Sequence, residues 1–203
     1  MSKDVLQKRG KYIGKVNSLL QEFHYAEASV LTKLVNIYAT SFYGSGVWDI
    51  NSAECQKLYK SWNVTVRQVY NLDRCAHRYL IEPVSQCLHP KVMIASRYVT
   101  FHKSLVNSKK FPVRFLARLN EMDYRTVLGR TLNSIADQCG VQGLECLSAT
   151  QVKKKCSYFL VPEAEQWRLP ILQELLEIRS GNLLTENLNK NEVDDMIENI
   201  CVT

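Results

Sequence analysis

Residues 8–48 of the chain read KRGKYIGKVNSLLQEFHYAEASVLTKLVNIYATSFYGSGVW, and this stretch decides the fold. Apolar residues recur along it at steps of three and four, which is the spacing of one buried face of an α-helix. The pattern predicts two amphipathic helices joined by a short turn. Ser29 is of a type that caps helices, so it is predicted to begin the second one. The aromatic and glycine residues of 42–48 then interrupt the helical pattern.

The first predicted helix has an apolar face and a basic face. Its apolar positions are Val5, Leu6, Tyr12, Ile13, Val16, Leu19, Leu20 and Phe23. Its opposite side carries Lys8, Lys11 and Lys15, with Gly10, Gly14 and Ser18 on the flank beside them. A glycine inside a helix costs about 1 kcal/mol relative to alanine, so two of them favour close approach by a negatively charged partner. The alternative is a solvated charged face with incidental glycines. Arg9 falls inside the apolar arc, where the pattern does not explain it.

The second and third predicted helices have similar apolar faces. The second buries Val30, Leu31, Leu34, Val35, Tyr38 and Phe42. The third begins at Asn51 or Ser52 and buries Cys55, Leu58, Tyr59, Trp62, Val66, Val69 and Tyr70, with Lys57, Lys60 and Arg67 on its other face. Both patterns predict amphipathic helices, like the first one.

The rest of the chain is also predicted to be helical. A short helix ends or kinks at Pro83, further helices begin at Pro90 and Pro112, and another stops at Gly140. Later segments are expected at residues 148–159, 171–179 and 191–202. No alternation typical of strands is present, so the sequence predicts an all-α, irregular bundle of about eight to ten helices. It divides into a helical hairpin at 1–50, a basic helical region at 51–180, and a linker with a short acidic helix at 181–203.

Charge is distributed unevenly along the 203 residues. Residues 1–130 hold 20 Lys and Arg against 9 Asp and Glu, a balance of +11, whereas residues 131–203 hold 6 against 11, a balance of −5. A basic front favours a polyanionic partner there. The alternative is that the acidic tail merely offsets the front. Seven cysteines at irregular spacings, without the apolar segment of a secretion signal or a membrane span, predict reduced thiols in a nuclear or cytoplasmic protein with no membrane partner.

Basic residues interleave with aromatic ones across residues 67–115. Lysine and arginine neutralise phosphates, whereas Tyr70, Tyr98 and Phe101 have the helical spacing of core residues. The predicted nucleic-acid-binding residues are Lys8, Lys11, Gly14, Lys15, Ser18, Lys57, Lys60, Arg67, Arg74, Arg78, Lys91 and Arg97.

Two other groups contain residue types that bind metal ions. Cys75, His77, Cys87 and His89 are the right residue types for zinc, but one-residue gaps suit tetrahedral ligation poorly, so no metal or other cofactor is expected. Asp194 and Asp195 are adjacent within an acidic helical pattern, where side chains point about 100° apart and cannot easily share an ion. They are interpreted as solvated charges, and no catalytic residue is predicted. No glycine-rich phosphate loop and no nucleophile elbow occur.

Five stretches carry a family resemblance. They are KRGKYIGKVNSLLQEF (8–23), LVNIYATSFYGSGVWD (34–49), LYKSWNVTVRQVYNL (58–72), HRYLIEPVSQCLHPKVM (77–93) and SRYVTFHKSLVNSKKFPVRFLARLN (96–120). They resemble the region that follows the palm in reverse transcriptases of LINE-type (non-LTR) retrotransposons, closest to the jockey-like RNA-directed DNA polymerases. The resemblance covers residues 8–130 and extends through Ile178. Its most specific part is the tyrosine–glycine pair Tyr43–Gly44 followed by Trp48.

The resemblance implies a function for each part. The first helix would be a thumb helix that packs against the template–primer duplex, and the later helices would belong to the linker that grips RNA and target DNA. The aromatic-Ala-Asp-Asp motif of the palm is absent, so the expectation is a truncated post-palm region that binds RNA/DNA duplex and does not polymerise. Its other implied partners are the missing palm and fingers. The alternatives are a helical protein-interaction module without nucleic acid, or a small zinc-stabilised domain.

Overall fold

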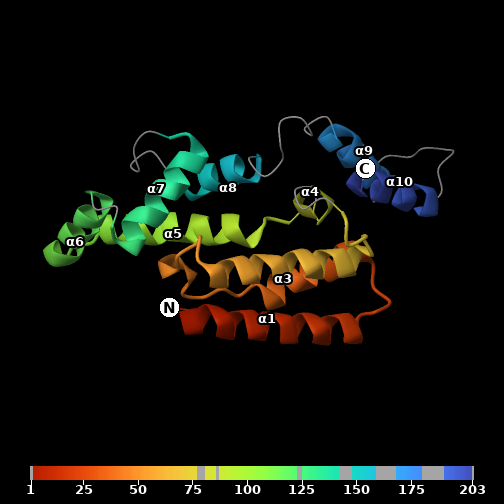
Figure 1. The fold of residues 1–203 in the computed structure, drawn as a ribbon, viewed down its shortest axis with the longest axis horizontal. Helices are drawn as coiled ribbons and strands as arrows, with labels where there is room; N and C mark the ends of the chain where they lie inside the picture. Colours follow the sequence, from red (N-terminus) through yellow and green to blue (C-terminus); the bar gives the residue numbers. More distant parts are fainter. Residues whose placement is uncertain are drawn as a thin grey trace.

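The computed structural model describes residues 2–76, 81–85, 87–122, 125–141, 148–158, 168–179 and 190–202. Every regular element in these ranges is helical, which confirms the all-α fold. Three long helices, α1 (Ser2–Glu22), α3 (Ala53–Tyr70) and α5 (Pro90–Val106), lie side by side as successive layers (Figure 1). None of the helices in the described ranges is long and apolar enough to cross a membrane.

The helix after α1 differs from its prediction. α2 (Ala28–Leu34) has Glu27, not Ser29, at its N-cap, and it continues into a π-helical turn, η1 (Val35–Ala39). A π-turn holds more residues than an α-turn, so it rotates the following side chains relative to the 3.6-residue pattern. Ala39 is therefore buried, whereas Tyr38, predicted to be buried, is exposed. Val30 was also predicted to be buried and is exposed.

The aromatic and glycine segment after η1 closes the hairpin. Phe42 packs between the rings of Tyr12 and Trp48, with centroids 6.2 Å from each. The indole Nε1 of Trp48 donates a hydrogen bond to Asp4 Oδ2 at 2.9 Å. Gly44 has φ +84°, a left-handed conformation that favours glycine, and it leads into the 3₁₀ turn η2 (Ser45–Val47). This segment thereby fixes the start of α1 to the chain that enters α3.

α3 begins after Ser52, one of the two residues predicted to start it. Ser52 is the N-cap, and its Oγ accepts a hydrogen bond from Cys55 N at 3.4 Å. Leu58 and Trp62 are almost fully buried. The helix ends at Asn71, which has φ 50° and adopts a left-handed C-cap. An amphipathic α3 therefore lies between α1 and α5, as its apolar spacing requires.

Several helix boundaries in the middle of the chain follow from local signals. Pro90 occupies the first turn of α5, and Gly140, at φ 58°, caps α7 (Val127–Cys139). Ser148 and Gln151 form a capping box at the start of α8 (Ala149–Tyr158), with each side chain accepting from the other's backbone N–H. Pro83 was predicted to end or kink a short helix, whereas α4 (Ile81–Ser85) continues past it to Ser85.

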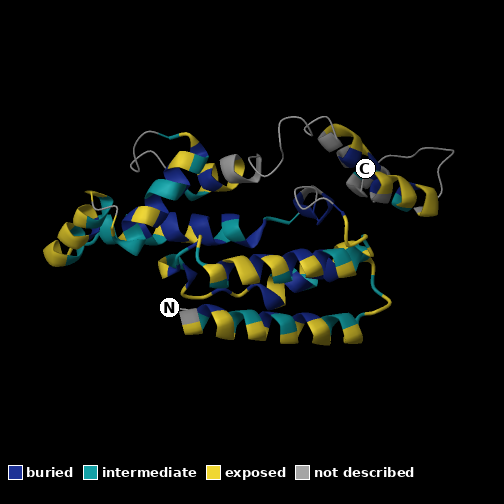
Figure 2. Cartoon of the chain, viewed as in Figure 1, coloured by how far each residue is buried: buried dark blue, intermediate teal, exposed yellow. Residues whose placement is uncertain are grey.

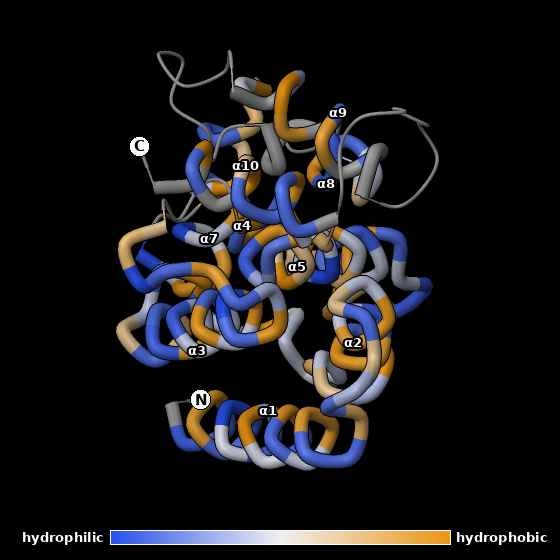
Figure 3. Tube along the Cα trace, turned by 90° about the vertical axis from the view of Figure 1, so that its right-hand side faces the viewer, coloured by the Kyte–Doolittle hydropathy of each residue, from blue (hydrophilic) through white to orange (hydrophobic). Residues whose placement is uncertain are grey.

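Two hydrophobic clusters hold the fold together. The main cluster joins α1, α3, α5, α7 and α8, and Figure 2 shows the buried residues of the long helices on the sides that face one another. The view in Figure 3 places α1 as an outer layer beneath α2 and α3. A smaller cluster joins α4 to α9 (Arg168–Arg179) and α10 (Lys190–Val202). The main core crosses the predicted boundary between residues 50 and 51. The predicted linker at 181–189 lies outside the described residues.

α6 (Phe111–Met122) lies at one end of the molecule and exposes several large apolar side chains. The exposed residues are Phe111, Phe115, Leu116, Leu119 and Met122. On its inner side, Ala117 is buried and Glu121 Oε1 lies 3.2 Å from His102 Nε2 of α5. No described element covers this face.

Candidate nucleic-acid interface

The glycine stripe of α1, formed by Gly10, Gly14 and Ser18, faces away from the core. All three residues are exposed. A Cβ atom added at Gly10 or Gly14 would meet no heavy atom within 4 Å, so no packing contact in the described part of the chain requires these glycines. Ser18 Oγ donates to the carbonyl oxygen of Gly14 at 3.1 Å, which keeps the hydroxyl close to the helix surface. The stripe is therefore an open, shallow strip along α1.

Arg9, which the apolar pattern did not explain, lies at the junction of α1 and α3. Its Nε donates a hydrogen bond to Ser61 Oγ at 2.8 Å. Lys57 and Lys60 of α3 reach the same place, and together with Arg9 they line a groove of about 320 Å³ between the two helices, here called the α1–α3 groove. Asn17 and Gln68 also line it and add polar side chains. Sequence reasoning missed Arg9, although a cation within an apolar arc was the signal.

The glycine stripe has a cation on one side and the α1–α3 groove on the other. At about 100° per residue, Lys11 follows the stripe in one direction around α1. In the other direction Asn17 comes first, and Ile13 lies between Asn17 and Arg9 in the lining of the groove. Lys11, Lys57 and Lys60 are exposed, and their ammonium groups make no hydrogen bond or ion pair with another described residue. Their ammonium groups are therefore available to phosphates on either side of a strip that lacks bulky side chains.

Three other predicted contact residues are used by the fold itself. Lys15 Nζ donates to the carbonyl oxygen of Tyr38 at 2.8 Å. Arg67 Nη2 donates to the carbonyl oxygen of Ala76 at 2.7 Å, and burial lowers the pKa of its guanidinium. Arg97 Nη1 donates to the carbonyl oxygen of Phe42 at 2.8 Å. Each cation thus joins two segments of chain.

The remaining predicted cations do not meet in the α1–α3 groove. Lys8 is half-buried on α1, Arg74 is exposed just beyond the end of α3, and Lys91 is half-buried in the first turn of α5. Arg78 lies outside the described residues. The structure therefore gathers Arg9, Lys57 and Lys60 in one groove and distributes these others elsewhere.

The cysteine and histidine residues of zinc-binding type lie apart from one another where they are described. Cys75 is exposed, and its backbone N–H donates to Asp73 Oδ1 at 2.6 Å. Cys87 accepts a hydrogen bond from Asn36 Nδ2. His89 is buried, and its Nδ1 accepts from Lys91 N at the start of α5. His77 lies outside the described residues. In the part of the chain that is described, no three His, Cys, Asp or Glu residues are arranged to hold a metal ion.

A buried carboxyl group lies beside His89. Glu82 Oε1 accepts a hydrogen bond from the backbone N–H of His89 at 3.1 Å, and burial raises the pKa of Glu82 to about 7. The His89 ring also packs against Tyr59 and Trp62, with centroids 5.2 and 5.0 Å away. These contacts join α4 and α5 to α3.

Asp194 and Asp195 lie within α10, as their acidic helical pattern predicted. Asp195 is exposed, whereas Asp194 is half-buried. Neighbouring residues of a helix project in directions about 100° apart, so the two carboxylates do not form a shared metal site.

Compared with protein families, with curated proteins and with solved structures, the chain matches none of them.

Proposed function

We propose that this chain binds a nucleic-acid duplex through its phosphates, with the glycine stripe of α1 against the sugar–phosphate backbone. The observation that carries the proposal is the open stripe, with Lys11 beside it on one side and, beyond Asn17 on the other, the α1–α3 groove with Lys57 and Lys60. Phosphate contacts need cations that are not committed to other partners, and Lys11, Lys57 and Lys60 meet that condition among the described residues.

The proposal is consistent with the family resemblance. A thumb helix of a jockey-like reverse transcriptase needs a surface of close approach beside basic residues, and α1 has one. We therefore propose an origin in the post-palm region of such a polymerase, with duplex binding and no polymerisation by this chain. None of the contacts described above reads a base edge, so binding is expected to tolerate any sequence.

A salt titration tests this function. The full chain is mixed with a fluorescently labelled RNA–DNA duplex, and the Kd is measured by anisotropy between about 50 and 200 mM salt. The logarithm of affinity should fall linearly with the logarithm of salt, by about 0.9 for each phosphate neutralised on a B-form duplex. Duplexes of unrelated sequence should give the same line. An affinity that does not change with salt would exclude the phosphate mechanism.

A second candidate function rests on α6. Its exposed apolar residues stand beside Lys109, Lys110, Arg114 and Arg118, so they suit a protein partner with an acidic rim around an apolar face. This is the helical protein-interaction module, and it needs no nucleic acid. Self-association through α6 is opposed by these like charges. Sedimentation velocity of the chain mixed with duplex separates the two candidate functions. A chain that binds duplex as a monomer, and binds it equally well after Leu116→Ser and Met122→Ser, does not use α6 for duplex binding.

A further inference from the structure

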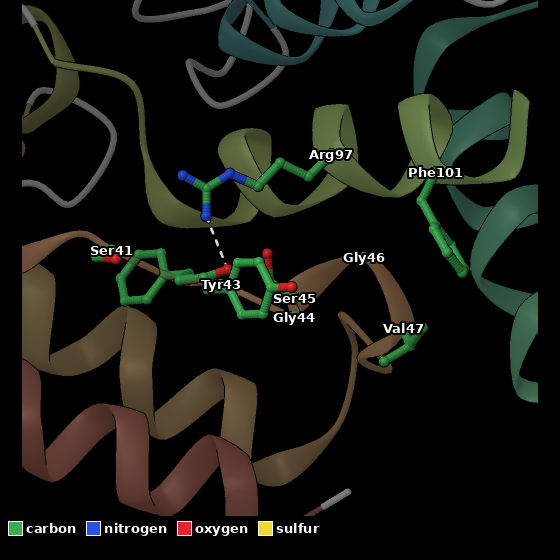
Figure 4. Close-up of a pocket in the computed structure, with 9 residues that line it drawn as sticks. Ser41, Tyr43, Gly44, Ser45, Gly46, Val47, Arg97 and Phe101 are labelled. Carbon is green, nitrogen blue, oxygen red and sulfur yellow. Dashed lines mark hydrogen bonds between the residues drawn. The ribbon is translucent and has the colours of Figure 1, made fainter. Parts of the chain in front are cut away.

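The segment that follows η1 forms a cavity with α5. It has a volume of about 480 Å³, which lies within the range typical of small-molecule sites. Tyr43, Gly44, Ser45 and Gly46 line it from the segment, and Arg97 and Phe101 line it from α5 (Figure 4). The sequence pattern did not predict this cavity, because the segment and the turn of α5 that line it are about fifty residues apart in the chain.

Two glycines give the cavity its shape. Gly44 turns the chain with φ +84°, which a residue with a side chain rarely adopts. Gly46 lies against α5, and a Cβ added there would be 3.1 Å from Phe101 Cβ and 3.5 Å from the carbonyl oxygen of Arg97. The backbone can therefore approach α5 closely at Gly46, and no side chain from either glycine occupies the cavity.

The lining combines aromatic rings with unused hydrogen-bond donors. The side chain of Tyr43 is exposed although it is aromatic, with an exposed fraction of 85%, and Phe101 is half-buried. Arg97 Nη1 is held by the carbonyl oxygen of Phe42, and the other guanidinium N–H groups make no hydrogen bond with a described residue. Ser45 is 1% exposed, and its Oγ also has no hydrogen-bond partner there.

These features suit a ligand with a planar aromatic group and an anionic group. Tyr43 and Phe101 can pack against an aromatic ring, as aromatic side chains do with unpaired bases. A guanidinium that keeps free N–H groups suits a phosphate, because its planar fork matches phosphate oxygens. Arg97 is exposed, so a purely apolar ligand would displace water from its free N–H groups without replacing those hydrogen bonds, which is costly.

We infer that this cavity binds one unpaired nucleotide, with its base against Tyr43 and Phe101 and its phosphate at Arg97. The inference rests on the proposed duplex binding and extends it. Lys15 of α1 is hydrogen-bonded to the carbonyl oxygen of Tyr38, three residues before Ser41 at the cavity. This contact ties the chain that leads into the cavity to the basic side of α1, and the inference includes the entry of an unpaired end nucleotide of a duplex on α1 into the cavity.

The experiment compares a blunt RNA–DNA duplex with the same duplex carrying one unpaired nucleotide at an end. The unmodified chain should bind the extended duplex about tenfold more tightly, a gain within the range of one base stacked on an aromatic side chain. Tyr43→Ala should abolish that gain and leave blunt-duplex binding unchanged. Tyr25→Ala is the matched control, since Tyr25 is 77% exposed and lies outside the cavity, and it should keep the full gain.

A second measurement tests the anionic part of the ligand. Adenosine 5′-monophosphate should bind the full chain more tightly than adenosine, and Arg97→Gln, which retains a donor for Phe42, should remove the difference. The inference is overturned if the unpaired nucleotide adds no affinity or if Tyr43→Ala keeps the gain. If no duplex binds at low salt, the proposed function fails by itself. The cavity is then tested with adenosine 5′-monophosphate alone. Its binding to the unmodified chain must saturate, and the Tyr43→Ala chain must lose that binding.

Discussion

Arg9 Nε donates a hydrogen bond to Ser61 Oγ across 2.8 Å, and this contact joins α1 to α3 beneath the α1–α3 groove. Ser61 in turn donates to the carbonyl oxygen of Lys57 at 2.9 Å. A cation is thereby held at a helix junction with two lysines nearby. When cations at such a site neutralise duplex phosphates, the phosphates release their counterions. The affinity for duplex then depends on salt concentration and not on base sequence.

The lysines of the α1–α3 groove should set the salt dependence of duplex binding. We expect Lys57→Ala with Lys60→Ala to weaken binding of all duplexes alike and to reduce the slope of log affinity against log salt by about 2. The matched control is Lys109→Ala with Lys110→Ala, which removes the same charge at the start of α6. Equal losses of slope in the two double variants would show that only net charge matters.

The glycine stripe should be sensitive to size and insensitive to folding. Gly14→Ala meets open space, so it should raise the free energy of unfolding by about 1 kcal/mol through helix propensity and weaken duplex binding little. Gly14→Leu should also fold, with helicity retained by circular dichroism, but should weaken binding strongly because its side chain blocks close approach. A Gly14→Leu chain that binds as tightly as the unmodified chain would contradict a backbone contact at this stripe.

Arg67 and Lys60 lie on the same helix but should respond differently to removal. Arg67→Ala leaves the carbonyl oxygen of Ala76 without its donor, which should lower the free energy of unfolding by about 1–3 kcal/mol. Lys60→Ala, at an exposed position, should change it by less than about 0.5 kcal/mol. Denaturant unfolding of both variants measures the difference. If the Arg67→Ala chain is as stable as the unmodified chain but binds duplex more weakly, Arg67 contacts the duplex and is not needed for stability.

Glu82 should make stability depend on pH. Burial raises its pKa in the folded chain to about 7 from an ordinary value of 4.5, so the folded state favours the protonated carboxyl. The resulting stabilisation is fully present below pH 4.5 and is lost as pH rises through 7, with a size on the order of 3 kcal/mol. Glu82→Gln keeps an oxygen acceptor for His89 N and cannot ionise. The free energy of unfolding of the Glu82→Gln chain, relative to that of the unmodified chain, should therefore rise between pH 5 and 8. If the two free energies change in parallel with pH, the burial of the Glu82 carboxyl is contradicted.

Much of the fold could be predicted from local patterns. The apolar spacing of Tyr12 and Val16 on α1 and of Leu58 and Trp62 on α3 identified buried faces, because amphipathic helices bury one side. Caps at Ser52 and Gly140 were correct, since their chemistry acts within one turn. The lysines of α1 and α3 were also identifiable as a basic surface, although their use in binding remains a prediction.

Other features depend on residues far apart in the chain, which local periodicity does not encode. Only the packing of α1 on α3 explains Arg9, and only the approach of α5 to the Gly44–Gly46 segment creates the cavity. Tertiary contacts also commit Arg67 and Arg97 to backbone carbonyls. The sequence by itself determined which faces are apolar, basic or open, because those follow from residue type at helical spacing. The tertiary structure decided which of those faces are covered and which cations stay available, because burial and pairing depend on partners that only folding brings within hydrogen-bond distance.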